Sequence, residues 1–442
     1  MRRILFFSMA LLCTLVAEAQ EQKQLSGRLQ LRHMSTANKG DLENFSGTVT
    51  HGYLRYKHSV KDWLTFGVQG NALVHFGIDN ITKRDALTGA GPIYEANLWN
   101  PNLLSGSSSF SLPQLYARFD LDKHEITLGR FLIETPTINS EPWPFPNAVQ
   151  GIWYDYSARS GLKFQLGVIN QISPRFSGEF DGIGETVGQI AVGLDENGNP
   201  ADYPGNVNSN FMGIANAKVD VNDQMTIDFW NYYTDNIHNT VLIEPVFKLE
   251  NDFALSGMFI YQFKVGEGGN ENPALSYLPE GHRASAFGLR LEKRKEHNLF
   301  QFNFSRIGAS GRMLMPREWG KEPFYTFQRR TRVEGLSDVT SLMVKWERTW
   351  TSEKSDTRLY SSIGTNRLNN PAEFVSNKLG VPSHVHWDAS IKYSPKGKGL
   401  KGVNIEWYLA YRFLDDDIGG NEAYRINKAD FFHSDILLTY TF

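Results

Sequence analysis

The chain has 442 residues but only one cysteine, Cys13, and no long apolar run after Val16. We expect the segment with Cys13 to be removed, so disulfides and cysteine–metal sites are excluded from the mature chain. The absence of a long apolar run excludes membrane-spanning helices. Neither sign of charge dominates, since 45 basic and 48 acidic residues give a net charge of −3. Nucleic-acid binding usually requires a strongly basic domain, so we expect no nucleic-acid partner.

The start of the chain has the three parts of a secretory signal. Arg2-Arg3 is a basic start, Ile4 to Val16 is an apolar stretch too short to span a membrane, and Ala17-Glu18-Ala19 fits an A-x-A cleavage site. We therefore predict a signal peptide over residues 1–19 and a single domain over residues 20–442.

The body of the chain alternates apolar and polar residues over segments of about ten residues, which is the pattern of membrane-crossing β-strands. The last segment has one apolar and one polar face: Phe432, Ile436, Leu438, Tyr440 and Phe442 against His433, Asp435, Thr439 and Thr441. Only every second side chain of such a strand meets lipid, which explains a mean hydropathy of only −0.38. A closed barrel is the remaining way for this chain to cross a membrane.

Short polar turns alternate with mostly longer connections. The longer connections are expected at residues 34–45, 78–111, 132–148, 172–210, 235–239, 266–282, 308–337, 367–383 and 415–430. The predicted fold class is all-β, a transmembrane antiparallel β-barrel of about 18 strands whose two ends lie in the periplasm. A barrel of this size encloses an aqueous pore unless something fills it. The first strand is expected near Gly27, which leaves no room for a preceding plug domain.

Arginines on the polar faces of the predicted strands are candidates for the pore wall. An Arg or Lys facing lipid costs about 2–4 kcal/mol at the midplane, so we expect these side chains to point into the lumen. There, a guanidinium group can bind a carboxylate through its planar fork. The strand candidates are Arg118, Arg290, Arg358 and Arg412. The alternative, that they pair with luminal acids and only stiffen the wall, stays open.

Two long connections have the composition of a pore constriction. Loop 132–148 is stiffened by four prolines, and its candidate residues are Glu134, Glu141, Trp143 and Phe145. Loop 308–337 combines aromatic and charged residues, with candidates Glu318, Trp319 and Tyr325. We expect both loops to fold inward and narrow the pore, although a rigid external cap and an ordinary surface loop are the alternatives.

Three stretches of sequence resemble the OprD-type outer-membrane porins. Leu128-Gly129-Arg130, followed by Thr135-Pro136 and Asn139-Ser140, resembles the entry into the third loop of that family. Pro146 to Gly151 resembles the exit from that loop, and Pro316 to Thr326 resembles the seventh loop. The resemblance implies an 18-stranded barrel narrowed by these two loops.

The resemblance also implies an arginine ladder that guides the carboxylate of small solutes. On the family pattern, its members are Arg130 at the start of the third loop and Arg329, Arg330 and Arg332 at the end of the seventh. Phe131 stands where many members carry a glutamine, so the preferred solute can differ.

The predicted function is a passive, substrate-selective porin in the outer membrane of a Gram-negative bacterium, for amino acids, peptides or organic acids. The alternatives are a general diffusion or anion-selective pore and, in another class, an adhesin or a barrel enzyme. No residue pattern supports catalysis, so we expect no enzyme and no cofactor. His384, His386 and Asp388 share one strand face, a spacing that suits metal ligands. We interpret them as polar wall residues instead and predict no metal site.

The expected partners are outer-membrane lipid, small solutes and the barrel-assembly machinery, which would bind the C-terminal strand. The chain is expected to be a monomer or a trimer. Aromatic residues near the strand ends are expected to form girdles at the membrane interfaces. These are Trp63, Trp153, Tyr154, Trp350, Tyr393 and Trp407.

Overall fold

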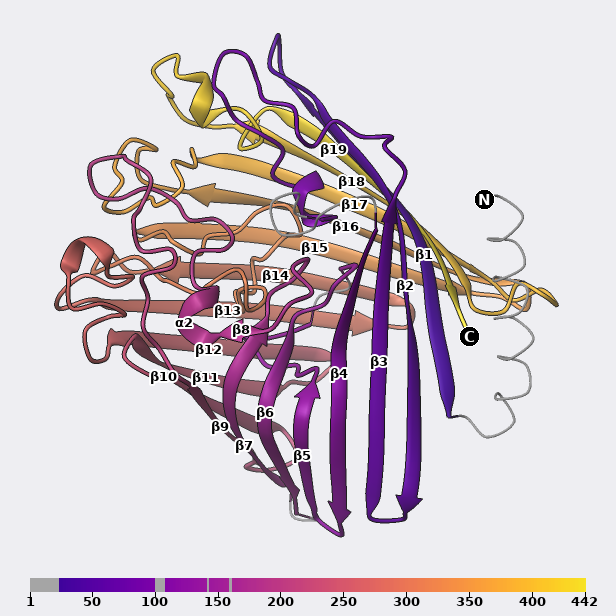
Figure 1. Cartoon of the computed structure of the whole chain (residues 1–442). Helices are drawn as coiled ribbons and strands as arrows, with labels where there is room; N and C mark the ends of the chain where they lie inside the picture. The colour runs from indigo at the N-terminus through magenta and orange to yellow at the C-terminus, as the bar shows by residue number, and fades with distance from the viewer. Residues whose placement is uncertain (1–23, 100–107, 141–142, 159–160) are drawn as a thin grey trace.

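The computed structural model describes residues 24–99, 108–140, 143–158 and 161–442. The predicted signal peptide lies outside the described residues. In this part of the chain, 18 antiparallel strands form one closed wall, and the long connections gather at one end of it and inside it (Figure 1). The predicted fold class and strand number are confirmed.

The elements follow the chain in order. The wall strands are β1 (Leu25–Asn38), β2 (Phe45–Lys61), β3 (Leu64–His75), β4 (Ser108–Leu121), β5 (His124–Phe131), β6 (Ala148–Ser157), β7 (Leu162–Ser173), β9 (Met212–Asp220), β10 (Met225–Thr234), β11 (His238–Lys248), β12 (Phe253–Lys264), β13 (Arg283–Lys295), β14 (Asn298–Ile307), β15 (Val339–Thr351), β16 (Ser355–Arg367), β17 (His384–Pro395), β18 (Val403–Leu414) and β19 (Phe431–Thr441). The short elements are η2 (Glu95–Asn97), β8 (Asp181–Gly182), α2 (Ile183–Thr186), η3 (Pro273–Leu275) and η4 (Glu422–Tyr424). No helix among the described residues is long and apolar enough to cross a membrane.

The wall closes where the first and last strands meet. β1 pairs antiparallel with β19, and Leu31 lies opposite Leu438. At the end of this seam, the Gly27 and Phe442 backbones exchange two hydrogen bonds of 3.0 Å. A Cβ on Gly27 would overlap the Phe442 ring, so glycine allows the last aromatic residue to lie across the first strand. The closed seam leaves no unpaired strand edge in the wall.

Short turns and long loops lie at opposite ends of the barrel. Two residues join β2 to β3 and β4 to β5, whereas residues 76–107 join β3 to β4 and residues 308–338 join β14 to β15. The predicted alternation of short and long connections is therefore confirmed. Several boundaries differ by a few residues. β1 extends to Asn38, so the loop predicted at residues 34–45 is shortened to residues 39–44, and β4 begins at Ser108, within the loop predicted at residues 78–111.

The two faces of the wall differ as the alternating sequence predicts. On β19, Ile436 and Leu438 are more than 40% exposed on the outer face, whereas His433 and Asp435 are buried on the inner face. Trp63 and Trp407 are exposed as expected for girdle residues, but Trp153 is buried and packs inside the barrel. The girdle prediction for Trp153 is wrong because it shares the inner face of β6 with Val149, which is also buried.

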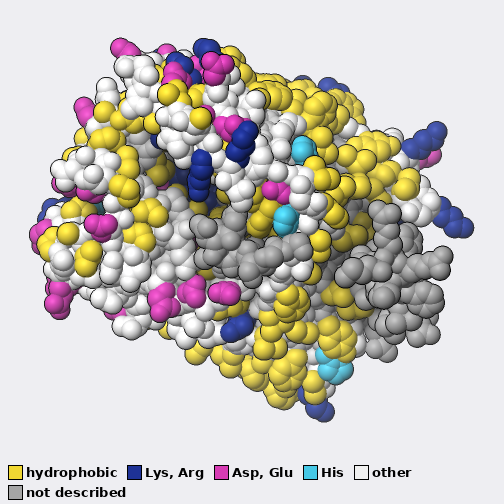
Figure 2. Space-filling view, turned by 45° about the horizontal axis from the view of Figure 1, so that its top comes forward, with side chains coloured by type: hydrophobic (Ala, Val, Ile, Leu, Met, Phe, Trp, Pro, Cys, Tyr) yellow, Lys and Arg dark blue, Asp and Glu magenta, His cyan; other side chains and the backbone are white. Residues whose placement is uncertain are grey.

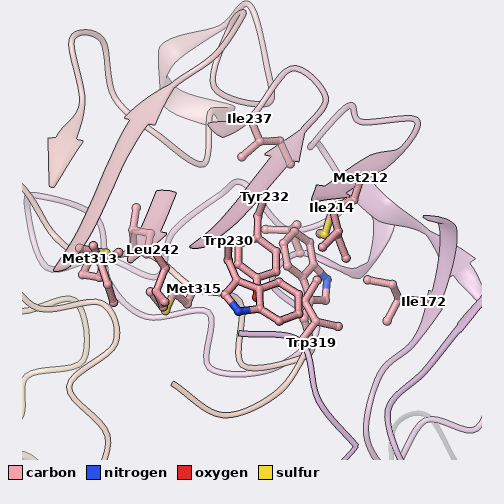
Figure 3. Close-up of a cluster of buried hydrophobic side chains, with 14 of the residues drawn as sticks. Ile172, Met212, Ile214, Trp230, Tyr232, Ile237, Leu242, Met313, Met315 and Trp319 are labelled. Carbon is pink, nitrogen blue, oxygen red and sulfur yellow. The ribbon is translucent and has the colours of Figure 1, made fainter. Parts of the chain in front are cut away.

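A large apolar cluster fills one side of the lumen. Strands β10 and β11 contribute Trp230, Tyr232 and Leu242, and loop 308–338 contributes Met315 and Trp319. These side chains point toward one another in Figure 3. The loop is therefore attached to the inner wall by buried apolar area as well as by polar contacts.

The outer face generates a test of membrane insertion. Replacing Leu31 with Arg places a charge against lipid near the middle of β1, and we expect the free energy of unfolding in lipid vesicles to fall by about 2–4 kcal/mol. Val60→Arg, at the short-turn end of β2, is the control and should cost about 0–1 kcal/mol. Denaturant titration of the vesicle-bound barrel measures both values. Equal losses for the two variants would contradict a lipid belt centred on Leu31.

Candidate functional site

The two loops predicted to narrow the pore meet inside the barrel. The backbone N–H of Asn139, in loop 132–147, donates to the carbonyl of Trp319 in loop 308–338 at 3.3 Å. The Asn139 amide side chain also donates to the Lys321 carbonyl (3.3 Å) and accepts from the Lys321 N–H (3.1 Å). A third link joins the side chain of Asn147 to the carbonyl of Glu318. Loop 132–147 thus folds inward, and the alternative of an external cap is excluded.

Aromatic residues of these loops fix the loops to the wall and to the short helix α2. Trp319 is buried and its indole N–H donates to the Thr186 hydroxyl at 2.8 Å. Phe145 is fully buried and Trp143 nearly so, in a cluster with Met34 and Val49 of the wall. These contacts hold the constriction in one arrangement, because each large ring removes apolar surface from water.

A buried charge cluster, formed by Arg317, Glu318, Glu334 and Lys378, ties loop 308–338 to loop 368–383. The Glu334 carboxylate lies 2.8 Å from Arg317 Nε and 3.7 Å from Lys378 Nζ. Burial alone would raise the pKa of Glu334, but the two cations outweigh it and hold the pKa below its ordinary value. Burial raises the pKa of the Glu318 carboxyl, whose Oε1 accepts two backbone N–H groups at 2.8 Å.

The larger cavity of the lumen, with a volume of about 890 Å³, is strongly basic. The described part of its lining has only two acidic residues, Glu406 and Asp435, against ten basic ones: Arg32, Arg84, Arg175, Arg317, Lys321, Arg329, Arg330, Arg332, Arg412 and Lys428. Dark-blue Lys and Arg side chains lie in a hollow of the surface in Figure 2. Burial lowers the pKa of Lys428 to about 8, so this lysine is still mostly charged at neutral pH. The excess of basic side chains gives the cavity an electrostatic potential that attracts anions.

Arg330 lies at the centre of the basic cavity. Its Nη2 is 2.9 Å from the Asp435 carboxylate, which also pairs with Arg32 at 2.5 Å. The Arg330 guanidinium carbon lies 5.2 Å from the Tyr408 ring centroid and 5.7 Å from that of Tyr94. One carboxylate thus pairs with two arginines, and cation–π contacts with the two aromatic rings further stabilise the Arg330 guanidinium.

Arg412 and Arg329 complete the group around Arg330. Arg412 donates to the carbonyls of Lys428 (2.7 Å) and Arg330, which connects the wall to two loops. Arg329 pairs with Glu406 at 2.5 Å and keeps 46% of its side chain exposed. Its guanidinium therefore remains accessible to a solute in the cavity.

The smaller cavity, of about 540 Å³, has mixed charge. Its acids are Glu134, Asp228, Glu244 and Glu322, and its bases are Arg290, Lys321 and Lys345. Lys321 and Phe327 line both cavities, so the two spaces adjoin at these residues. The Arg290 guanidinium carbon lies 4.1 Å from the Tyr325 ring centroid, and the Tyr325 hydroxyl donates to Glu244 at 2.5 Å.

Some predicted residues line neither of these two cavities. Arg118 and Arg358 are on the inner face near the short turns, where they pair with Asp120 (3.3 Å) and Glu347 (2.6 Å). Arg130 donates to Gln150 at 3.0 Å on the wall. The pore role of these three arginines stays a prediction. Phe145, Glu318 and Trp319 hold the loops and line neither of the two cavities, and Glu141 lies outside the described residues.

Sequence reasoning missed several residues of the basic cavity. The alternation of side chains along a strand could have identified Arg32, because it lies between Leu31 and His33 and Leu31 faces outward. Asp435 also lies on the polar face of its predicted strand. Lys321 and Lys428 are in loops, and no local signal places a loop side chain in the lumen.

The described part of the loop between β3 and β4, residues 76–99, also enters the lumen and lines the basic cavity. Tyr94 donates its hydroxyl to the carbonyls of Arg330 (3.1 Å) and Asn427 (2.9 Å). The adjacent Glu95 is fully buried and accepts a 2.6 Å hydrogen bond from Thr36. Burial raises the pKa of Glu95 to about 7, so protonation of its carboxyl favours the docked loop.

The architecture consists of a closed 18-stranded wall, a lumen narrowed by inward-folded loops, and two adjoining charged cavities. The fold is that of the OprD-type outer-membrane porins, so the resemblance noted in the sequence is confirmed at the level of the fold.

Solved structures with this fold cover nearly the whole chain. The chain is similar to OccK3 (OpdO) of Pseudomonas aeruginosa, with 12% identity, 96% of each chain covered and a TM-score of 0.66. It is also similar to OccAB4 of Acinetobacter baumannii, with 13% identity, coverage of 95% of this chain and 99% of the other, and a TM-score of 0.69. The third example is P. aeruginosa OpdK, solved with vanillate, with 12% identity, coverage of 95% and 98%, and a TM-score of 0.65. No family model and no curated protein sequence matches the chain.

The buried Glu95 predicts that loop docking depends on pH. Its pKa is raised from an ordinary 4.5 to about 7 in the docked loop. Docking should therefore be strongest at or below about pH 4.5, weaken as the pH rises toward 7, and change little above that, with a total loss of up to about 3 kcal/mol. Hydrogen exchange of the Leu98 amide, which donates to the Glu95 carbonyl at 2.9 Å, reports this docking.

Glu95→Gln is the matched control for this titration. It keeps the shape of the side chain but has no proton to lose, so the ratio of wild-type to variant exchange rates removes the intrinsic effect of pH on exchange. A ratio that stays constant between about pH 5 and 8 would contradict a titrating Glu95.

Proposed function

We propose that the protein is an outer-membrane porin for passive, substrate-selective diffusion of small solutes that carry a carboxylate. The single observation that carries this proposal is the ten-to-two excess of basic over acidic residues around the larger cavity. Fixed charge of one sign in a low-dielectric cavity raises the local concentration of oppositely charged solutes. The fold shared with outer-membrane channels and the apolar outer face support the location.

Arginine makes a carboxylate the favoured anionic group. Eight of the ten basic residues around the cavity are arginines, and the planar guanidinium matches a carboxylate with two parallel hydrogen bonds. Their neighbours Tyr94, Trp143 and Tyr408 add apolar surface for the rest of a small organic solute. The structure of OpdK was solved with vanillate, which is a property of that protein and lends the proposal support by analogy only.

The mixed charge of the smaller cavity supports zwitterionic solutes as well as simple anions. Asp228 and Glu244 lie on β10 and β11, whereas Arg290 and Lys345 lie on β13 and β15. A solute with both an ammonium and a carboxylate group would find partners for each. An anion-selective pore without solute preference is the second candidate, because the same excess of basic charge attracts every small anion.

The proposal includes an orientation. We place the short turns and both chain ends in the periplasm and the long loops outside, as is usual for barrels of this class. The exposed aromatic and apolar residues of β19 would then be available to the barrel-assembly machinery before closure. A monomer and a trimer are both compatible with this arrangement.

Removing the central arginine tests the proposed function. In planar bilayers, wild-type protein should conduct, prefer anions in a salt gradient, and be blocked by small carboxylates. Arg330→Gln should weaken the block by about tenfold, because one hydrogen bond to a charged group contributes about 1.5–3 kcal/mol. Arg32 still pairs with Asp435 in this variant, so no buried carboxylate is left alone.

Arg294→Gln is the matched control, since it removes an arginine that pairs with Glu292 beside a short turn and lines neither cavity. Its block by carboxylates should equal that of wild type. The channel claim fails if wild-type protein shows no conductance. If chloride and carboxylates of equal charge compete equally well for the pore, the pore is anion-selective without preference for carboxylates.

A further inference from the structure

The two central arginines of the basic cavity lie at the tip of a tight turn, Gln328–Thr331, which we name the arginine turn. Gln328 and Thr331 form an isolated β-bridge, and the Thr331 N–H donates to the Gln328 carbonyl at 3.1 Å. Arg329 and Arg330 occupy the two positions between them. Two adjacent cations in a basic cavity repel each other and their neighbours, so the turn needs contacts that hold it in place.

One end of the arginine turn is held by Asp388 on the inner face of β17. The Gln328 side-chain amide donates to Ser362 Oγ (2.8 Å) and Asp388 Oδ1 (3.2 Å). Asp388 is fully buried and lines neither cavity. It also accepts hydrogen bonds from the hydroxyls of Tyr360 (3.0 Å) and Tyr408 (3.1 Å).

Asp388 also fixes the aromatic surface beneath both arginines. The hydroxyl of Tyr408 is held by Asp388, and its ring centroid lies 4.9 Å from the guanidinium carbon of Arg329 and 5.2 Å from that of Arg330. The same buried carboxylate thus positions the base of the turn and the ring on which the guanidinium groups rest.

The other end of the arginine turn is held by His384. Its Nδ1 lies 2.8 Å from the Pro382 carbonyl, an acceptor, so this nitrogen carries the proton. Nε2 is then the acceptor, and it receives the Thr331 hydroxyl at 3.0 Å and the Asn366 amide at 3.1 Å. His384 and Asp388 lie on one face of β17, four residues apart, which matches the two ends of the turn. The described residues contain no group of three or more His, Cys, Asp or Glu side chains that could hold a metal ion.

We infer that Asp388 and His384 are positioning residues that set the carboxylate affinity of the pore by clamping the arginine turn. This inference rests on the proposed function. A bidentate contact with a carboxylate needs the plane of a guanidinium group in a fixed orientation, and side chains that support a binding site act by limiting its movement. The effect of Asp388 on the solute is therefore indirect and passes through Gln328 and Tyr408.

A positioning role and a purely electrostatic role of Asp388 predict opposite results for Asp388→Asn. If Asp388 acted only through its charge, its removal would make the cavity more positive and tighten the block by a carboxylate. If it positions the turn, the block weakens. We expect Asp388→Asn to weaken the block of the bilayer conductance by benzoate by about tenfold, comparable to the loss of a charge-assisted hydrogen bond.

Tyr408→Phe provides an independent variant in which every charge is kept. It removes the hydroxyl that Asp388 holds but leaves the ring beneath the arginines, so it should weaken the block in the same direction by about threefold. The double variant should lose little more than Asp388→Asn alone, because both changes break the same contact. If Asp388→Asn does not insert as a folded barrel, Tyr408→Phe and His384→Gln test the clamp instead. Each should weaken the block by benzoate.

Asp155→Asn is the charge-matched control. Asp155 is a carboxylate on β6 that accepts a 2.6 Å hydrogen bond from Gln165 and lines neither cavity. Its removal should leave the benzoate block unchanged. A wild-type channel that conducts but is not blocked by benzoate or other small carboxylates overturns the proposed function, and the clamp with it. A blocked wild type, with Asp388→Asn and Tyr408→Phe blocked as tightly or more tightly, overturns the clamp alone.

Discussion

The ion pair between Arg330 and Asp435 joins loop 308–338 to the last strand of the wall. Asp435 also pairs with Arg32 of β1, so the same carboxylate bridges the seam at which the barrel closes and the loop that narrows it. Its position follows from the alternation of β19, which turns His433 and Asp435 inward while Ile436 and Leu438 face out. The arrangement of the lumen therefore depends on the wall being closed in the correct register, since a slip of one residue would turn Asp435 toward lipid.

Buried carboxylates offset the mutual repulsion of the cations that line the basic cavity. Ten cations around one cavity repel one another, yet a carboxylate placed in the cavity itself would compete with the solute. In this chain, Asp388 and Glu334 lie behind the lining, where they hold the loop without facing the cavity. Asp435 and Glu406 are the exceptions, since they lie in the lining, where Asp435 is already paired with two arginines and Glu406 with Arg329. The charge available to a solute and the charge that stabilises the loop are thus largely separate.

The wall could be predicted from the sequence far better than the lumen. A period of two fixes which side chains of a strand face lipid, because the wrong register costs several kcal/mol for each charge, and this rule places Arg290 and Arg412 correctly. The girdle prediction, which rests on position along the strand and not on this rule, fails at Trp153, because an aromatic residue near a strand end is equally suited to an interface and to an inner cluster. Inside the lumen there is no periodicity to use. Glu318 binds backbone N–H groups of loop 174–211, a contact between residues distant in sequence that composition cannot reveal.

The order of the two cavities bears on how the proposed passive pore would both select and release a solute. The basic cavity is lined by loop residues of the long-loop end, such as Ile93 and Lys428, whereas the mixed cavity is lined by Glu244 and Gln301, which lie toward the short turns on their strands. On the proposed function, an anion that passed Lys321 would leave a region of excess positive charge and enter one where Glu134, Asp228 and Glu244 offset the bases. Conduction requires binding that is strong enough to admit a solute and weak enough to let it go. A fall in net positive charge along the path would allow both the admission and the release of a solute without a conformational change.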